Sequence, residues 1–212
     1  MKNLAYLFLA YTIMLAFSCK DKDDDATTAP ISATEYFPLS PGNYWIYNWV
    51  KIDTMGNETP YIRIDTVTVT GEEVVNGFTY AKVKGTNFGG EFEHLYRDSS
   101  GFLVKADGGT PVFSVNQGIL LGQDTTWSGD FPLFWTEEKM KTGFSPVTVP
   151  AGTFEECLSK DLLIYPLGLE SPFGVRTYPY YYAKGVGLVQ HYISFYSTPD
   201  YYESRLVEYH IE

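Results

Sequence analysis

Few side chains in this sequence combine the types and spacing that catalysis or metal binding would need. The three histidines, His94, His191 and His210, lie far apart along the chain. No His-x-x-x-His or Cys-x-x-Cys pair supplies the spacing of a metal site. Cys157 would need an activating base or cation to act as a nucleophile, and its sequence neighbours identify none. We therefore predict no catalytic residue, no metal and no cofactor, and a protein that is not an enzyme.

A carboxylate pair is the remaining catalytic candidate. Glu91 and Glu93 alternate with Phe92 and His94, so in a strand they share one face at a spacing that a glycosidase could use. The apolar partners occupy the opposite face. This pattern is more typical of the solvated side of a strand than of an active site.

Aromatic residues offer a different kind of chemistry, because they make up 17% of the chain and occur in clusters. Exposed aromatic rings stack on sugar rings, whereas buried rings fill the core of a sheet. Both interpretations stay open at this point. The residues that we predict as possible ligand contacts are Trp45, Trp127, Trp135, Tyr180 and Tyr181.

The beginning of the chain has the features of an export signal. Lys2 precedes an uncharged apolar run over residues 4–17, which is shorter than the roughly 20 residues of a membrane span. The stretch Leu15-Ala-Phe-Ser-Cys19 resembles the lipobox of bacterial lipoproteins, although Phe17 stands where a small residue is more usual. That resemblance implies a signal peptide over residues 1–18 and a lipid on the sulfur of Cys19.

The residues that follow Cys19 are charged and mostly acidic, from Lys20 to Asp25. This patch resembles the export signal of Bacteroidetes surface lipoproteins, which implies an outer-membrane location with the protein exposed on the cell surface. A solvated spacer between lipid and domain is the alternative. We assign residues 19–34 to a tether and residues 35–212 to a single domain.

The charge of the chain restricts its partners. The 212 residues carry a formal net charge of −11, and loss of Lys2 with the signal peptide would make the chain one unit more negative. Nucleic acid and anionic headgroups repel such a protein, so we expect no nucleic-acid partner, and we expect membrane attachment through acyl chains. The sequence identifies no protein partner.

The pattern of the domain is that of strands almost throughout. Valine, isoleucine, threonine and aromatic residues recur between closely spaced turn signals, such as Asn76-Gly77. Residues 61–70 alternate, with Ile62 and Ile64 on one face and Arg63 and Asp65 on the other. We predict an all-β fold with little helix, an antiparallel meander that forms a half-open barrel or a sandwich. A short helix is expected over residues 114–121, and an irregular segment over residues 127–134.

The stretch Tyr182-Ala-Lys-Gly-Val-Gly-Leu-Val189 is expected to form a β-hairpin, because glycines occupy its centre. Tyr96 to Leu103 repeats its spacing of tyrosine, glycine and two apolar residues. Further matches in the same order lie upstream of both stretches. They suggest that residues 36–115 and 116–212 are two related halves, with convergent hairpin chemistry as the alternative.

Three stretches also resemble recurring motifs of an uncharacterised, Bacteroidetes-type family of outer-membrane lipoproteins. They are Pro38-Leu-Ser-Pro-Gly-Asn-Tyr-Trp45, Val149-Pro-Ala-Gly-Thr-Phe154 and Tyr181-Tyr-Ala-Lys-Gly-Val-Gly-Leu-Val189. The resemblance covers most of residues 36–190 and implies an anchored β-domain without a known activity.

Three functional hypotheses follow. The first is a lipid-anchored surface domain with a non-enzymatic binding or structural role. The second is a glycan-binding accessory lipoprotein of a polysaccharide-uptake system, and the third is a periplasmic carrier of an apolar ligand in an open barrel.

Overall fold

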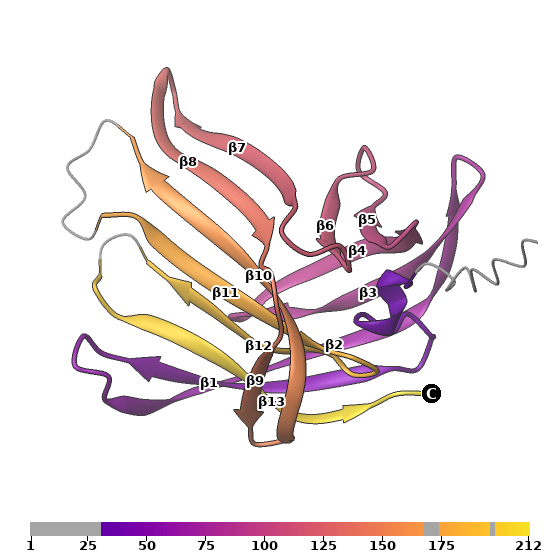
Figure 1. The fold of residues 1–212 in the computed structure, drawn as a ribbon, viewed down its shortest axis with the longest axis horizontal. Helices are drawn as coiled ribbons and strands as arrows, with labels where there is room; N and C mark the ends of the chain where they lie inside the picture. Colours follow the sequence, from indigo (N-terminus) through magenta and orange to yellow (C-terminus); the bar gives the residue numbers. More distant parts are fainter. Residues whose placement is uncertain (1–30, 168–173, 196–197) are drawn as a thin grey trace, which may run out of the picture.

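The structure, a computed structural model, describes residues 31–167, 174–195 and 198–212. Within these ranges the chain forms one antiparallel sheet of thirteen strands, which curls into a nearly closed barrel (Figure 1). The predicted all-β fold, with its half-open barrel, is confirmed. The predicted signal peptide, the lipidated Cys19 and the tether up to residue 30 lie outside the described residues.

The described part of the chain begins with the 3₁₀ turn η2 (Ala33–Glu35) and continues through strands alone. The strands are β1 (Tyr44–Ile52), β2 (Glu58–Val75), β3 (Phe78–Asn87), β4 (Gly90–Ser99), β5 (Phe102–Lys105), β6 (Pro111–Ser114), β7 (Leu120–Ser128), β8 (Phe131–Met140), β9 (Ser145–Val149), β10 (Gly152–Pro166), β11 (Arg176–Ala183), β12 (Gly187–Ser194) and β13 (Tyr201–His210).

The strand order shows how the barrel closes. Along the sheet it runs β6-β5-β4-β3-β2-β1-β13-β12-β11-β10-β8-β7, with β9 paired to the first part of β10. The last strand therefore pairs with the first, from Tyr44 opposite His210 to Ile52 opposite Tyr201. The ladder is interrupted between β6 and β7, in the middle of the chain. Residues 36–115 thus contribute β1 to β6, and residues 116–212 contribute β7 to β13, so each predicted half forms one continuous side of the barrel.

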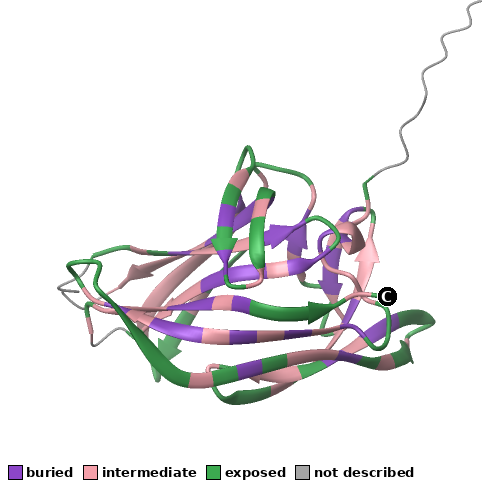
Figure 2. Cartoon of the chain, turned by 90° about the horizontal axis from the view of Figure 1, so that it is seen from below, coloured by how far each residue is buried: buried purple, intermediate pink, exposed green. Residues whose placement is uncertain are grey.

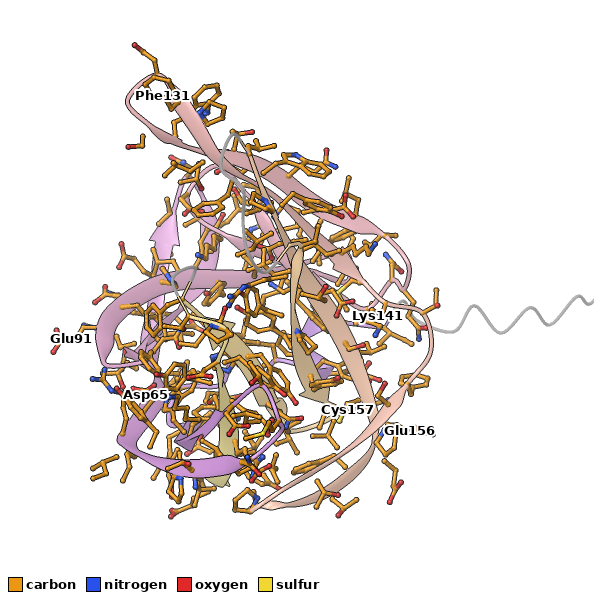
Figure 3. The ribbon with its side chains drawn as sticks, turned by 90° about the vertical axis from the view of Figure 1, so that its left-hand side faces the viewer. Asp65, Glu91, Phe131, Lys141, Glu156 and Cys157 are labelled. Carbon is orange, nitrogen blue, oxygen red and sulfur yellow. The ribbon has the colours of Figure 1, made fainter. Side chains whose placement is uncertain are left out.

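Two local predictions were wrong. No helix forms over residues 114–121, where β6 ends and a short loop leads into β7, and residues 127–134 are not irregular. They form the end of the β7–β8 hairpin, with Trp127 opposite Pro132 and Ser128 opposite Phe131. Figure 3 shows Phe131 at the tip, pointing away from the barrel. Both faces of this projecting end contact solvent, so its sequence lacks the alternation that would have revealed a strand.

The alternation of the strands creates the core. In β1, Trp45, Tyr47 and Trp49 are buried while their neighbours Tyr44, Ile46 and Asn48 are less so. Figure 2 shows such alternation as bands of buried and exposed residues along the strands. Burying a large apolar side chain contributes roughly 1.5–3 kcal/mol, so the inward-facing rows hold the curled sheet together.

The two turns that repeat in the sequence hold the same N-terminal segment. Near the β4–β5 turn, Asp98 accepts a 2.6 Å hydrogen bond from the Ala33 amide and another from the Ser32 hydroxyl. In the β11–β12 turn, the Gly185 amide donates to the Glu35 carbonyl at 2.6 Å, and Lys184 pairs with the Glu35 carboxylate at 2.8 Å. Ser32 and Ala33, assigned from sequence to the tether, are therefore fixed against the barrel. The predicted Tyr182–Val189 hairpin is confirmed.

Candidate functional site: the barrel cavity

A cavity of about 310 Å³ lies between the two sides of the barrel. Its walls come from almost every strand, and Phe37 contributes from the N-terminal segment. The lining residues are Phe37, Trp45, Tyr47, Val67, Val83, Asn87, Phe92, Tyr96, Leu103, Lys105, Val112, Glu138, Lys160, Tyr180, Tyr182, Gly187 and Leu188. Aromatic and aliphatic walls with a few polar groups are the usual composition of a small-molecule site.

Two aromatic residues of the cavity wall, Trp45 and Tyr47, donate their polar hydrogens to backbone carbonyls. Trp45 is 3% exposed and donates its indole N–H to the Val186 carbonyl at 2.6 Å. The Tyr47 hydroxyl donates to the Leu188 carbonyl at 2.8 Å, and burial raises the pKa of Tyr47. With these groups satisfied, the ring faces are left for packing against one another or against a ligand.

Three charged side chains of the described part of the chain reach the cavity. Lys160 on β10 is 7% exposed, and its Nζ lies 2.6 Å from a Glu138 carboxylate oxygen and 4.7 Å from the centre of the Tyr180 ring. Glu138 on β8 and Lys105 on β5 are only half-buried. A buried ammonium requires such compensation, because its transfer out of water is costly.

Next to Lys160, a buried histidine continues the inner wall. His191 stacks on Tyr180 with the ring centres 5.2 Å apart and meets the edge of Trp49 at 5.1 Å. Its Nε2 lies 3.4 Å from the Asn87 side-chain oxygen, whereas its Nδ1 has no hydrogen-bond partner among the described residues. Burial lowers the pKa of His191 to about 4, so the ring is neutral at physiological pH.

Beyond His191, the β3–β4 turn folds an aromatic ring over the neighbouring inner wall. Phe88 has φ of 49°, an uncommon value for a bulky residue, and its ring contacts Trp49, Tyr61 and Tyr202. Asp65, which is 2% exposed, holds this turn: it accepts from the Phe88 amide and the Trp49 indole, each at 2.6 Å, and from the Gly89 amide at 3.2 Å. Figure 3 shows Asp65 among the side chains that crowd this part of the barrel.

The five aromatic residues predicted from sequence as possible ligand contacts lie in different places. Trp45 and Tyr180 line the cavity together. Trp127 is 59% exposed on the β7–β8 hairpin. Trp135 is half-buried against Tyr165, with ring centres 4.6 Å apart, and Tyr181 is half-buried outside the cavity lining.

Sequence reasoning missed the charged residues of the cavity. A signal for one of them was present: Leu158, Lys160 and Leu162 alternate, so they share a strand face on which a charge is unexpected. For Lys105 and Glu138 no local signal exists, because their strands are short or irregular in pattern and the partners are remote in sequence.

The other residues considered for chemistry remain apart from one another. Cys157 is buried on β10, and burial raises the pKa of its thiol to about 11, so it is protonated at neutral pH. His94 packs between Phe92 and Tyr96 on β4, as predicted, and burial lowers the pKa of His94. Glu91 and Glu93 are exposed, as predicted, and Figure 3 shows Glu91 directed outward.

The described residues offer neither a cluster of metal ligands nor a helix that could cross a membrane. Among them, no three histidine, cysteine, aspartate or glutamate side chains are grouped so that they could hold a metal ion. In the same ranges, no helix has both the length and the apolar character needed to cross a membrane.

The described chain is thus a β-barrel with an interior cavity. Two solved structures resemble it. A crystal structure of a protein assigned as exported, with a YmcC-like fold, from Bacteroides fragilis NCTC 9343 matches 83% of this chain and 99% of its own, at a TM-score of 0.50 and 15% identity. A protein assigned as a lipoprotein, from Parabacteroides distasonis ATCC 8503, matches 83% of this chain and 98% of its own, at a TM-score of 0.48 and 13% identity. No family model and no curated protein matches the chain. At this identity, the likeness to the first structure shows a shared fold.

Proposed function

We propose that this is a non-enzymatic, lipid-anchored envelope protein that binds a small, largely apolar ligand inside its barrel. The observation that carries the proposal is the 310 Å³ cavity, which has aromatic and aliphatic walls and few polar groups. By its size it suits a ligand of roughly fifteen non-hydrogen atoms. The proposal thus combines the binding role of the first hypothesis with the apolar ligand of the third.

The location is a separate part of the proposal. Cys19 carries the lipid, the acidic stretch after it directs the protein to the outer membrane, and the barrel is exposed on the cell surface. The lipobox-like sequence supports the anchor, and the fold that this chain shares with a protein assigned as exported agrees with an envelope location.

A cavity-filling variant tests ligand binding. Val112 lines the cavity and is half-buried, so Val112→Trp should fill part of the space, whereas Val207→Trp adds the same ring at an exposed position on β13. The purified full chain, held in a non-ionic amphipol, is titrated with a neutral fluorescent apolar probe, and amphipol alone is subtracted. We expect at least tenfold weaker binding in Val112→Trp and unchanged binding in Val207→Trp. Equal binding by both variants would show that the probe does not enter the barrel.

The anchor and its location have their own experiment. Cys19→Ala should abolish the incorporation of radiolabelled lipid, and unchanged labelling would refute the anchor. Added protease should degrade the wild-type protein on intact cells. Protection until the outer membrane is broken would instead place the barrel in the periplasm.

Glycan binding is a second candidate, and one observation favours it. Trp127 and Phe131 are 59% and 77% exposed on the projecting β7–β8 hairpin, where their rings are accessible for stacking on sugars. Retardation in gels that contain polysaccharide tests this function. Trp127→Ala should abolish retardation, and Phe144→Ala, which removes an exposed ring outside the hairpin, should not. Equal retardation of wild-type protein and Trp127→Ala would exclude the hairpin as a glycan site.

A further inference from the structure

The charges on the cavity wall indicate more about the ligand than its size. Of the described residues that line the cavity, Lys105 and Lys160 are basic and Glu138 is acidic. The wall thus carries an excess of positive charge, although the whole chain has a net charge of −11. This local reversal of sign is the starting point of the inference, which rests on the proposed function.

Lys160 is positioned by the ladder itself. Lys160 lies on β10, opposite Met140 of β8 on one side and opposite Tyr180 of β11 on the other, and it is almost completely buried. Its ammonium group has three N–H donors. Glu138 accepts at 2.6 Å, and the Tyr180 ring lies 4.7 Å away. These contacts leave donor capacity for a further acceptor on the cavity side.

Lys105 comes from the other half of the barrel. It lies at the end of β5, opposite Tyr96, whose ring also lines the cavity. Among the described residues, no carboxylate lies within 4.0 Å of its Nζ, in contrast to Lys82, Lys84 and Lys160. Its positive charge acts on the surroundings, because it helps to lower the pKa of His94 after the larger effect of burial.

We infer that the ligand is an amphiphile with an apolar body and one acidic headgroup, which Lys160 and Lys105 receive from the two sides of the cavity. The body packs against Trp45, Phe37 and Tyr182, and the acid group compensates the charge that Glu138 alone does not balance. A carboxylate and a phosphate monoester share this chemistry, because lysine binds either of them as a point charge. A cationic headgroup would meet two ammonium groups, and a neutral one would leave the charge of Lys105 beside apolar surface.

Displacement of the neutral probe by ligands with the same chain and different headgroups tests the inference. The competitors are dodecanoate, dodecyl phosphate, dodecanol and dodecyltrimethylammonium, each used below its micellar concentration with the full chain in non-ionic amphipol. One or both acids should displace the probe at a concentration about tenfold lower than dodecanol does. A charge-assisted hydrogen bond is stronger than a neutral one, and the difference corresponds to about a tenfold change in affinity. The ammonium compound should be the weakest.

Variants locate the effect. Lys105→Met and Lys160→Met should each reduce the preference for acid over alcohol severalfold, and Glu138→Gln should increase it by removing the competing carboxylate. Lys84→Met is the matched control, because Lys84 lies on β3 outside the cavity lining and pairs with Glu93. If Lys160→Met does not fold, the half-buried Lys105 gives the same information.

The outcomes separate this inference from the proposed function. Equal displacement by acids and alcohol, or an acid preference that survives in Lys105→Met and Lys160→Met, would refute the acidic headgroup while ligand binding stands. A probe that does not bind the wild-type protein at all would refute the proposed function itself. Comparison of dodecanoate with dodecyl phosphate distinguishes the two headgroups. The acid that displaces the probe at the lower concentration carries the preferred one.

Discussion

Within the described residues, two charged clusters lie inside the barrel, one around Asp65 and one around Lys160. They differ in how many of their hydrogen-bonding partners the protein itself supplies. Asp65 receives three donors, the Trp49 indole and the amides of Phe88 and Gly89, and is sealed from solvent. Lys160 has one carboxylate partner, Glu138, whose side chain is 38% exposed, and it borders the cavity. A charge that the fold itself satisfies stabilises the fold, whereas a charge that borders a cavity is available to a ligand. His191 contacts Trp49 on one side and Tyr180 on the other, and thereby joins the two clusters.

The largest expected difference between the clusters is in stability. Asp65→Ala would leave the buried Trp49 indole and the part-buried amides of Phe88 and Gly89 without their acceptor, so we expect a loss of about 4 kcal/mol in the free energy of unfolding. Chemical denaturation measures it. Asp53→Ala is the matched control, because Asp53 also accepts hydrogen bonds within a turn but is exposed to water. Similar losses in both variants would contradict a special role for the Asp65 cluster.

The histidine between the clusters should make stability depend on pH. In the unfolded chain His191 binds a proton near pH 6.5, whereas in the fold burial holds its pKa at about 4. The unfolded state therefore binds more protons between these values, and stability should fall by about 3 kcal/mol as pH drops from 7 to 4. His191→Phe, which keeps the ring contacts, should remove that part of the pH dependence. His210→Phe, at an exposed position, should leave the pH dependence unchanged. Identical pH profiles for the wild-type protein and both variants would refute the role of His191.

The β3–β4 turn tests whether the Asp65 cluster serves to place an aromatic ring. Phe88→Ala removes the contacts with Trp49, Tyr61 and Tyr202, and we expect it to cost about 2 kcal/mol in thermal or chemical unfolding. Phe131→Ala truncates a phenylalanine beside another hairpin turn, where the ring is 77% exposed, and should change stability by less than about 0.5 kcal/mol. A loss of the same size in both would mean that the Phe88 ring contributes no specific packing.

The smallest effect on stability should come from the cluster that borders the cavity. Lys160→Met keeps most of the apolar stem and leaves Glu138 in contact with water, so we expect a change of less than about 1 kcal/mol. The same substitution should have a large effect on ligand selectivity. A loss as large as that of Asp65→Ala would assign Lys160 to the structural framework and remove the contrast between the clusters.

Much of the fold could be predicted from local patterns. The Asn76-Gly77 turn adopts the positive φ values of 52° and 80° that a two-residue hairpin requires, and the Tyr182–Val189 hairpin forms as expected. The β7–β8 hairpin was missed because it projects from the barrel, where no buried face imposes a period of two. Only part of the candidate site was predicted. Trp45 and Tyr180 were among the predicted ligand contacts, whereas Lys160, Lys105 and Glu138 were not.

By itself, the sequence determined that this chain forms antiparallel strands joined by tight turns, because strand propensity and positive-φ turns depend on neighbouring residues. The tertiary structure decided which face of each strand lies inside. Along β2, Ile62 is fully exposed and Ile64 is 72% exposed, while Asp65 is buried. Alternation assigns residues to two faces, but the curvature of the whole sheet selects the inner one. The cavity, with charges from β5, β8 and β10 on its wall, exists only once strands distant in sequence have closed around it.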